Sequence, residues 1–185
     1  MDNWSKYVLL VIFIFLIVKI NKGQDTEQTM VELVTVNYVD LNRYAGVWHE
    51  IARIPNRFQK QCARNVTAAY SLNDDGAIKV INRCLQEDGI EDKAIGKARV
   101  IDTTSNAKLE VSFVSIFGFH LFWGDYWIIG LDEDYQYAII GAPSRKYGWI
   151  LSRQKTMSEE LYTEAEQILL SQGYNPDDFE LTIQK

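Results

Sequence analysis

The stretch that decides the fold of this chain is NRYAGVWHEIAR, which spans residues 42–53. Gly46 permits a tight backbone approach where the chain turns into a strand, because glycine lacks a Cβ atom. Trp48 follows two residues later and can close one end of whatever the sheet encloses. A tryptophan near a strand start is more often plain core. Gly46 and Trp48 therefore indicate a fold only together with the strands that follow them, and with Arg153 near the end of the last strand.

Short strands follow this stretch at regular spacing. Turn sequences such as NDDG at 73–76 and DED at 132–134 separate them at hairpin length. The expected strands span residues 47–54, 66–72, 78–85, 93–101, 109–114, 125–131, 137–141 and 147–153. Consecutive hairpins of this kind are typical of an up-and-down barrel or a sandwich, and a closed barrel leaves no unpaired strand edge. We therefore expect an all-β fold, an eight-stranded up-and-down antiparallel β-barrel.

One C-terminal helix is expected after the last barrel strand. Thr156 and Glu159 have the spacing of a capping box at its start. Apolar residues then recur at helical spacing: Met157, Leu161, Ala165, Ile168 and Leu169. Gly173 ends the helix, and residues 179–183 could form a ninth short strand. We expect the apolar stripe to pack on the outside of the barrel.

The composition limits the classes of function. The chain has 185 residues, 47% of them hydrophobic and 24% charged, as is usual for one globular domain with a short appendage. Its net charge is −6 and no cluster of Lys and Arg occurs, so no nucleic acid is expected as a partner. Two cysteines and the scattered histidines His49 and His120 do not make a zinc site, and no metal or cofactor is expected.

The N-terminus has a different character from the rest. Residues 7–18 form an almost wholly apolar run with lysines on both sides. This run is shorter than the roughly 20 residues of a membrane span, so residues 1–23 are expected to be a signal peptide, with an uncleaved N-terminal anchor as the alternative. Residues 24–37 form a lead-in, with a helical turn near 41–44. Either way the domain is expected to be exported, to the periplasm, to the cell envelope or by secretion.

Cys62 and Cys84 suit such an oxidising compartment. Each lies on the outer flank of a predicted hairpin, so the two could meet across neighbouring strands. A disulfide is expected, and two free buried thiols are the alternative.

Alternation along each strand selects the side chains that face inward. If Trp48 points inward, Glu50 and Ala52 share its face. The candidate lining residues are Ala52, Ala68, Tyr70, Val80, Asn82, Val111, Phe113, Tyr126, Ile128, Tyr147 and Trp149. Inward hydroxyls and amides favour a cavity over a solid core, because buried polar groups require partners. Eight-stranded barrels can be of either kind.

Three blocks of sequence together resemble the lipocalin family, in particular its bacterial lipocalin and apolipoprotein D branch. They are LNRYAGVWHEIAR at 41–53, GDYWIIGLD at 124–132 and YGWILSR at 147–153. The resemblance covers roughly residues 38–185, which we expect to be the barrel with its C-terminal helix.

The resemblance implies that Gly46, Trp48 and Arg153 meet at the closed end of the barrel and act in stability. It also implies an open cup, without catalysis, that transports or stores a fatty acid, a lysophospholipid or a similar lipid, in membrane lipid upkeep. Many bacterial relatives carry a lipid-modified cysteine at the end of the signal peptide. No cysteine precedes Cys62 here, so that anchor is not expected, and membrane association would require another segment.

Alternatives remain open at this point. Some barrel relatives use a pocket thiol as a nucleophile, and Cys62 could be cast in that role, although no nearby histidine is evident to activate it. The aromatic stretch 117–123 could be a hydrophobic lip, a surface for a homodimer, or ordinary packing at the barrel rim.

Overall fold

An antiparallel barrel dominates the computed structural model, which describes residues 31–73 and 76–185. The expectations for residues 1–23 and for the first part of the lead-in fall outside these residues. No helix within the described ranges has both the length and the apolar character needed to cross a bilayer.

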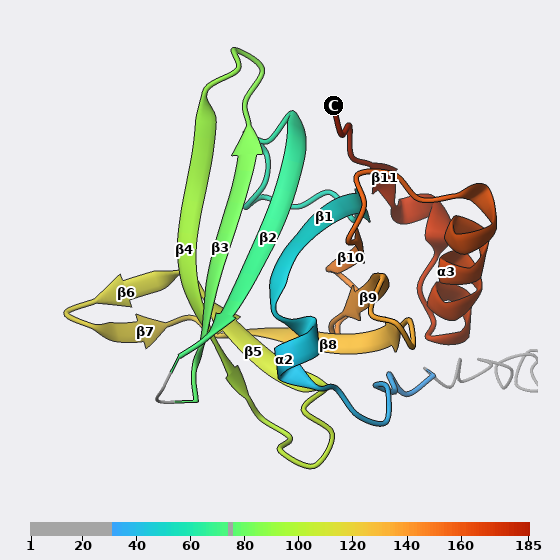
Figure 1. Cartoon of the computed structure of the whole chain (residues 1–185), viewed down its shortest axis with the longest axis horizontal. Helices are drawn as coiled ribbons and strands as arrows, with labels where there is room; N and C mark the ends of the chain where they lie inside the picture. The colour runs from blue at the N-terminus through green and yellow to red at the C-terminus, as the bar shows by residue number, and fades with distance from the viewer. Residues whose placement is uncertain (1–30, 74–75) are drawn as a thin grey trace, which may run out of the picture. The chain divides into compact units, whose positions relative to one another are not determined.

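Within the described residues, eight strands follow one another around the barrel, and the last pairs with the first (Figure 1). They are β1 (Gly46–Arg53), β2 (Arg64–Leu72), β3 (Ile78–Leu85), β4 (Glu91–Val100), β5 (Lys108–Ser112), β8 (Gly124–Leu131), β9 (Tyr137–Gly141) and β10 (Gly148–Ser152). The β1–β10 pairing closes the barrel, with His49 opposite Ser152 and Arg53 opposite Trp149. The predicted fold is confirmed, with strand ends displaced by a few residues.

The connections alternate between the two ends of the barrel. The short helix α2 (Leu41–Tyr44), which Asp40 caps through its carboxylate, leads into β1 at one end. The β2–β3, β4–β5 and β8–β9 turns lie at that same end, because neighbouring strands are antiparallel. The other end carries residues 54–63, the β3–β4 turn, the β5–β8 connection and the β9–β10 turn.

The β5–β8 connection is itself a hairpin, which the sequence analysis did not predict. Strand β6 (Val114–Ile116) pairs with β7 (Phe119–Leu121) in a separate two-stranded sheet. Figure 1 shows this hairpin projecting from the barrel, on the side opposite the C-terminal helix.

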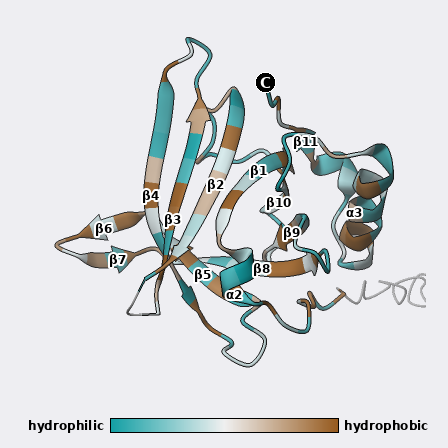
Figure 2. Cartoon of the chain, viewed as in Figure 1, coloured by the Kyte–Doolittle hydropathy of each residue, from teal (hydrophilic) through white to brown (hydrophobic). Residues whose placement is uncertain are grey.

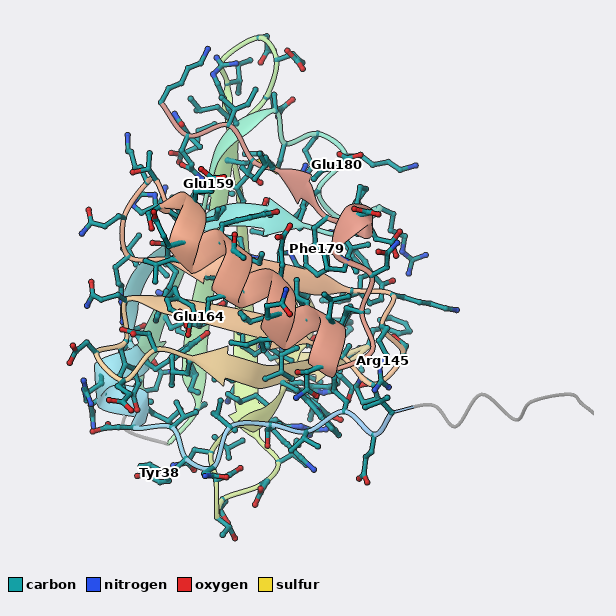
Figure 3. The ribbon with its side chains drawn as sticks, turned by 90° about the vertical axis from the view of Figure 1, so that its right-hand side faces the viewer. Tyr38, Arg145, Glu159, Glu164, Phe179 and Glu180 are labelled. Atoms are coloured by element: carbon teal, nitrogen blue, oxygen red, sulfur yellow. A yellow bond between two sulfur atoms is a disulfide. The ribbon has the colours of Figure 1, made fainter. Side chains whose placement is uncertain are left out.

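The C-terminal helix α3 (Glu159–Ser171) packs on the outside of the barrel, as predicted (Figure 3). Its buried residues Ala165 and Leu169 join an outer apolar cluster with the outward side chains of β8, β9 and β10. The hydroxyl of Tyr137 donates to the Glu164 carboxylate at 2.8 Å. The predicted cap was displaced: Ser158, and not Thr156, accepts a hydrogen bond from the first turn.

The C-terminal segment fills a gap between β1 and β2. These strands pair only over Gly46–His49 and then diverge. After the turn η1 (Pro176–Asp178), strand β11 (Glu180–Leu181) pairs with the end of β1. The Gln184 side chain then donates to the carbonyls of both Glu50 and Val66 at 2.9 Å. The ninth strand predicted within 179–183 is thus present as β11, and the segment that contains it bridges β1 and β2 where these strands diverge.

Candidate functional site

The closed end of the barrel is sealed by Trp48 and Arg153. The Trp48 side chain is fully buried, and its indole N–H donates to the Tyr44 carbonyl at 2.8 Å. The Arg153 guanidinium lies 3.8 Å from the centre of the indole ring. Its N–H groups donate to the carbonyls of Arg43, Tyr44, Ala45, Val47 and Tyr135, at 2.7–3.3 Å. This is the geometry that the family resemblance implied.

Gly46 is needed at this place for two reasons. Its φ of +100° lies in a region that other residues rarely adopt. A Cβ atom on Gly46 would also lie only 3.2 Å from Nη1 of Arg153. A side chain here would therefore adopt a strained backbone conformation and press on the guanidinium.

The floor above this seal consists of Tyr44, Tyr70 and Tyr126. The hydroxyl of Tyr126 lies 2.7 Å from that of Tyr44 and 2.8 Å from that of Tyr70. Burial is the main cause that raises the pKa of each of these tyrosines above its ordinary value. The hydroxyls therefore satisfy one another and stay protonated at neutral pH.

Little free volume remains beside this tyrosine floor. A cavity of about 10 Å³ lies there, lined by side chains that include Leu41, Ile78 and Leu109. That is room for a single water molecule at most. The lower half of the barrel is thus a packed core.

The upper half differs, because inward side chains there are small or remain accessible. Inward Ala68 pairs with Trp48 on one side and with Asn82 on the other, and both Ala68 and Asn82 are only partly buried. Phe113 lies against Gly96, yet it is 39% exposed. An inward side chain in a closed barrel can be exposed only if the interior opens to the outside. Among the predicted lining residues, Ala68, Asn82 and Phe113 are therefore inward side chains that keep some access above the tyrosine floor.

The prediction for Ala52 was wrong. A β-bulge between Glu50 and Ala52 shifts the register of β1 against β10, so alternation fails at that point. Ala52 is fully buried in the outer cluster beneath α3, and Arg53 takes the inward position opposite Trp149. Predicted residues Tyr70, Val80, Val111, Tyr126 and Ile128 do belong to the inner cluster or pack against it.

A polar network at the mouth was missed by the sequence analysis. Glu50 is 3% exposed, and its carboxylate accepts hydrogen bonds of 2.6 Å from Arg53, Gln59 and Thr182. Gln59, from the β1–β2 loop, also accepts from the Trp149 indole at 3.0 Å. The only available signal was an acidic residue at an inward position of β1.

Aromatic side chains continue this wall toward the loop. The Tyr147 and Trp149 rings are nearly parallel, with centres 6.3 Å apart, and Phe58 of the β1–β2 loop lies 6.0 Å from Tyr147. A cleft of about 330 Å³ lies against the same loop, lined by Arg53, 55–57, Gln59, Lys60 and Glu180. The loop therefore covers part of the mouth and brings basic side chains to it.

The predicted disulfide is confirmed. Cys62 and Cys84 are bonded, with their Cα atoms 5.4 Å apart, and the bond ties the β1–β2 loop to the end of β3. Among the described residues, the group with the spacing of a metal site consists of these two cysteines and Asp92. Both sulfur atoms are already in the disulfide, so this group is not a metal site.

Comparisons with known proteins agree with this geometry. A family model described as a lipocalin-like domain matches residues 39–184. The outer membrane lipoprotein Blc of Escherichia coli K12 is 39% identical over 148 residues, which cover 80% of each chain. Temperature-induced lipocalin-1 of Arabidopsis thaliana is 40% identical over 147 residues, which cover 78% of each.

A solved structure supports the fold independently. Insecticyanin from the tobacco hornworm Manduca sexta aligns with a TM-score of 0.65 at 23% identity. The match covers 82% of this chain and 84% of that one.

Proposed function

Because the chain belongs to the lipocalin family, whose members bind small hydrophobic ligands, we propose that it carries or stores a lipid in the upper half of its barrel. We expect that lipid to be a fatty acid or a lysophospholipid. The observation that carries the proposal is the contrast between the sealed tyrosine floor and the accessible inward side chains Ala68, Asn82 and Phe113 above it.

Burial of hydrocarbon provides most of the affinity in such a site. Covering roughly 300 Å² of a lipid chain at ~25 cal/mol per Å² contributes about 7 kcal/mol before the cost of ordering the ligand. No chemical step is required for this.

Polar groups in the upper half would set the head group. The Asn82 side-chain oxygen is buried and has no hydrogen-bond partner among the described residues, so it can accept from a ligand. Arg57 and Lys60 line the cleft at the mouth together with Glu180, whereas Arg53 there is paired with Glu50, so Arg57 and Lys60 are the cations that would favour an anionic head group. Tyr126, by contrast, is engaged in the floor. We therefore place the hydrocarbon tail toward the tyrosines and the head group at the mouth.

A steric block tests this proposal. Ala68→Trp would fill the space between Trp48 and Asn82 with an indole, whereas Ala69→Trp places the same side chain on the outward face of the same strand. Displacement of a fluorescent fatty acid should be lost in the Ala68→Trp protein and retained in the Ala69→Trp protein. Equal binding by both variants would refute the barrel as the site.

We propose a carrier and not an enzyme. The thiol nucleophile that was the enzymatic alternative is unavailable, since Cys62 is held in the disulfide. After the purified chain is incubated with a lipid, native mass spectrometry should show that lipid bound at its original mass. A cleaved or modified lipid would support the enzymatic alternative.

We also propose that the domain is exported. The disulfide suits an oxidising compartment, and the bacterial relative is named as an outer membrane lipoprotein. Residues 1–23 would be either a cleaved signal or a retained anchor. The mass of the mature chain distinguishes these two outcomes.

A further inference from the structure

The β6–β7 hairpin presents apolar side chains to the outside. Val114 pairs with Leu121 and Ile116 with Phe119, so these residues share one face of the ribbon, and Phe117 occupies the turn. Phe117 is 97% exposed, Phe122 82% and Phe119 75%. Residues 113–123 include no Asp, Glu, Lys or Arg. Figure 2 shows hydrophobic residues along both arms of the hairpin.

Two of these phenylalanines stand in an unfavourable backbone conformation. Phe117 has a φ of +50° and Phe122 a φ of +56°, values that favour glycine or asparagine and disfavour bulky side chains. Neither ring is buried in return. Strain of this kind persists where it serves a function. Both exposed rings are thus available to a partner outside this chain.

The polarity of the hairpin changes along its length. Its tip carries Phe117 and Phe119, whereas its base carries Phe122 and Trp123, whose indole N–H donates to the His120 carbonyl at 3.1 Å. The Arg99 guanidinium lies 4.1 Å from the centre of the Trp123 ring. Phenylalanine at the tip with tryptophan and arginine behind it is the order found where a protein enters a bilayer from water.

The composition of the patch argues against a protein partner. A stable protein interface has a polar rim around its apolar centre. Residues 113–123 hold no Asp, Glu, Lys or Arg that could form such a rim. The cleft of about 330 Å³ on this chain is lined by charged and polar groups, so it does not match an apolar hairpin from a second copy.

We propose that the β6–β7 hairpin is a docking element for a lipid bilayer. Phe117 and Phe119 enter the acyl region, and Phe122, Trp123 and Arg99 remain at the level of the head groups. The hairpin continues directly from Phe113, which lies on the inner wall of the barrel, so docking would bring the mouth to the membrane surface. The inference extends the proposed carrier function, but its test does not depend on cargo.

A fluorescent label reports insertion at the hairpin itself. Both cysteines of the chain are in the disulfide, so Phe117→Cys introduces a single reactive thiol for an environment-sensitive dye. Vesicles of phosphatidylcholine and phosphatidylglycerol should shift the dye emission to the blue, and a nitroxide on the vesicle acyl chains should quench it. Leu170→Cys, an exposed position on α3, is the matched control and should show neither change. An unchanged emission at position 117 would overturn the proposal, even if the protein binds vesicles through residues 1–30.

Charge substitution gives the second measurement. Phe117→Asp and Phe119→Asp should each lower vesicle affinity at least about tenfold, whereas Leu170→Asp should not. If light scattering instead shows a dimer that Phe117→Asp dissociates, the hairpin contacts a second copy and the proposal fails. The labelled hairpin should respond equally in an Ala68→Trp background, so loss of cargo binding and loss of docking are separable.

Discussion

The guanidinium of Arg153 lies 3.8 Å from the centre of the Trp48 indole ring. This contact joins the first barrel strand to the residue that directly follows the last one. The guanidinium also donates to the carbonyl groups of Arg43, Tyr44 and Ala45 in the α2–β1 segment. The contact therefore holds together the two edges between which the barrel closes.

Replacing Arg153 tests this role in stability. Arg153→Ala removes the cation–π contact and leaves several carbonyls without donors, which should cost about 3 kcal/mol. At about 2–4 °C per kcal/mol, the melting temperature should fall by roughly 10 °C. Arg153→Lys should recover only part of this loss, because one ammonium group cannot reach the same set of carbonyls. An unchanged melting temperature in the alanine variant would show that the contact is dispensable.

The disulfide should stabilise the protein by a similar amount. It closes a loop of 22 residues, for which chain entropy predicts about 3 kcal/mol. The Cys62→Ala/Cys84→Ala protein should therefore melt about 10 °C lower than the oxidised protein. Dithiothreitol should lower the melting temperature of the natural sequence and leave that of the double variant unaltered.

Glu50 should be the most sensitive polar residue at the mouth. Glu50→Ala leaves Arg53 largely buried without its carboxylate and releases Gln59, a change that costs about 3 kcal/mol for a buried pair. Hydrogen exchange across residues 55–63 should accelerate as the loop detaches. Glu87→Ala on the exposed β3–β4 turn is the control and should leave both stability and exchange unaltered.

The tyrosine floor should make the fold sensitive to alkali. Burial raises the pKa of Tyr70 and Tyr126, so the folded protein holds these protons more tightly than the unfolded chain does. Their contribution to stability is complete below about pH 10, the ordinary tyrosine pKa, and is lost as the pH rises above it. Tyr126→Phe should reduce the slope of unfolding free energy against pH in that range. An identical slope in both proteins would contradict the assignment.

Strand alternation was a reliable guide wherever pairing is regular. It placed Tyr70, Val80 and Tyr126 on the inner face, because each lies in an uninterrupted ladder. It failed at Ala52, because a bulge inserts one residue without a signal in the sequence. The same bulge turned Arg53 inward, so the ion pair at the mouth was also beyond prediction.

The hairpin shows a different limit. Residues 114–121 are apolar along one face, but both strands of this hairpin are mostly exposed. Alternation in a sequence predicts which residues are buried, so it gave no sign of these strands.

The displaced helix cap has a local cause. Thr156 and Ser158 can both accept from a first helical turn, and the extended backbone at Ser158 lets its side chain accept from the Leu161 N–H.

The pairing of β1 with β10 has a consequence for the order of assembly. One edge of β1 pairs with β2, the next strand in the sequence. The other edge pairs with β10, roughly a hundred residues further along the chain. Contacts so distant in sequence form late, because the entropy cost of closing a large loop comes before the contacts stabilise the fold. During synthesis, one edge of β1 therefore stays unpaired until almost the whole barrel has been made. If the chain were exported before it folds, this edge would have less opportunity to pair wrongly during synthesis.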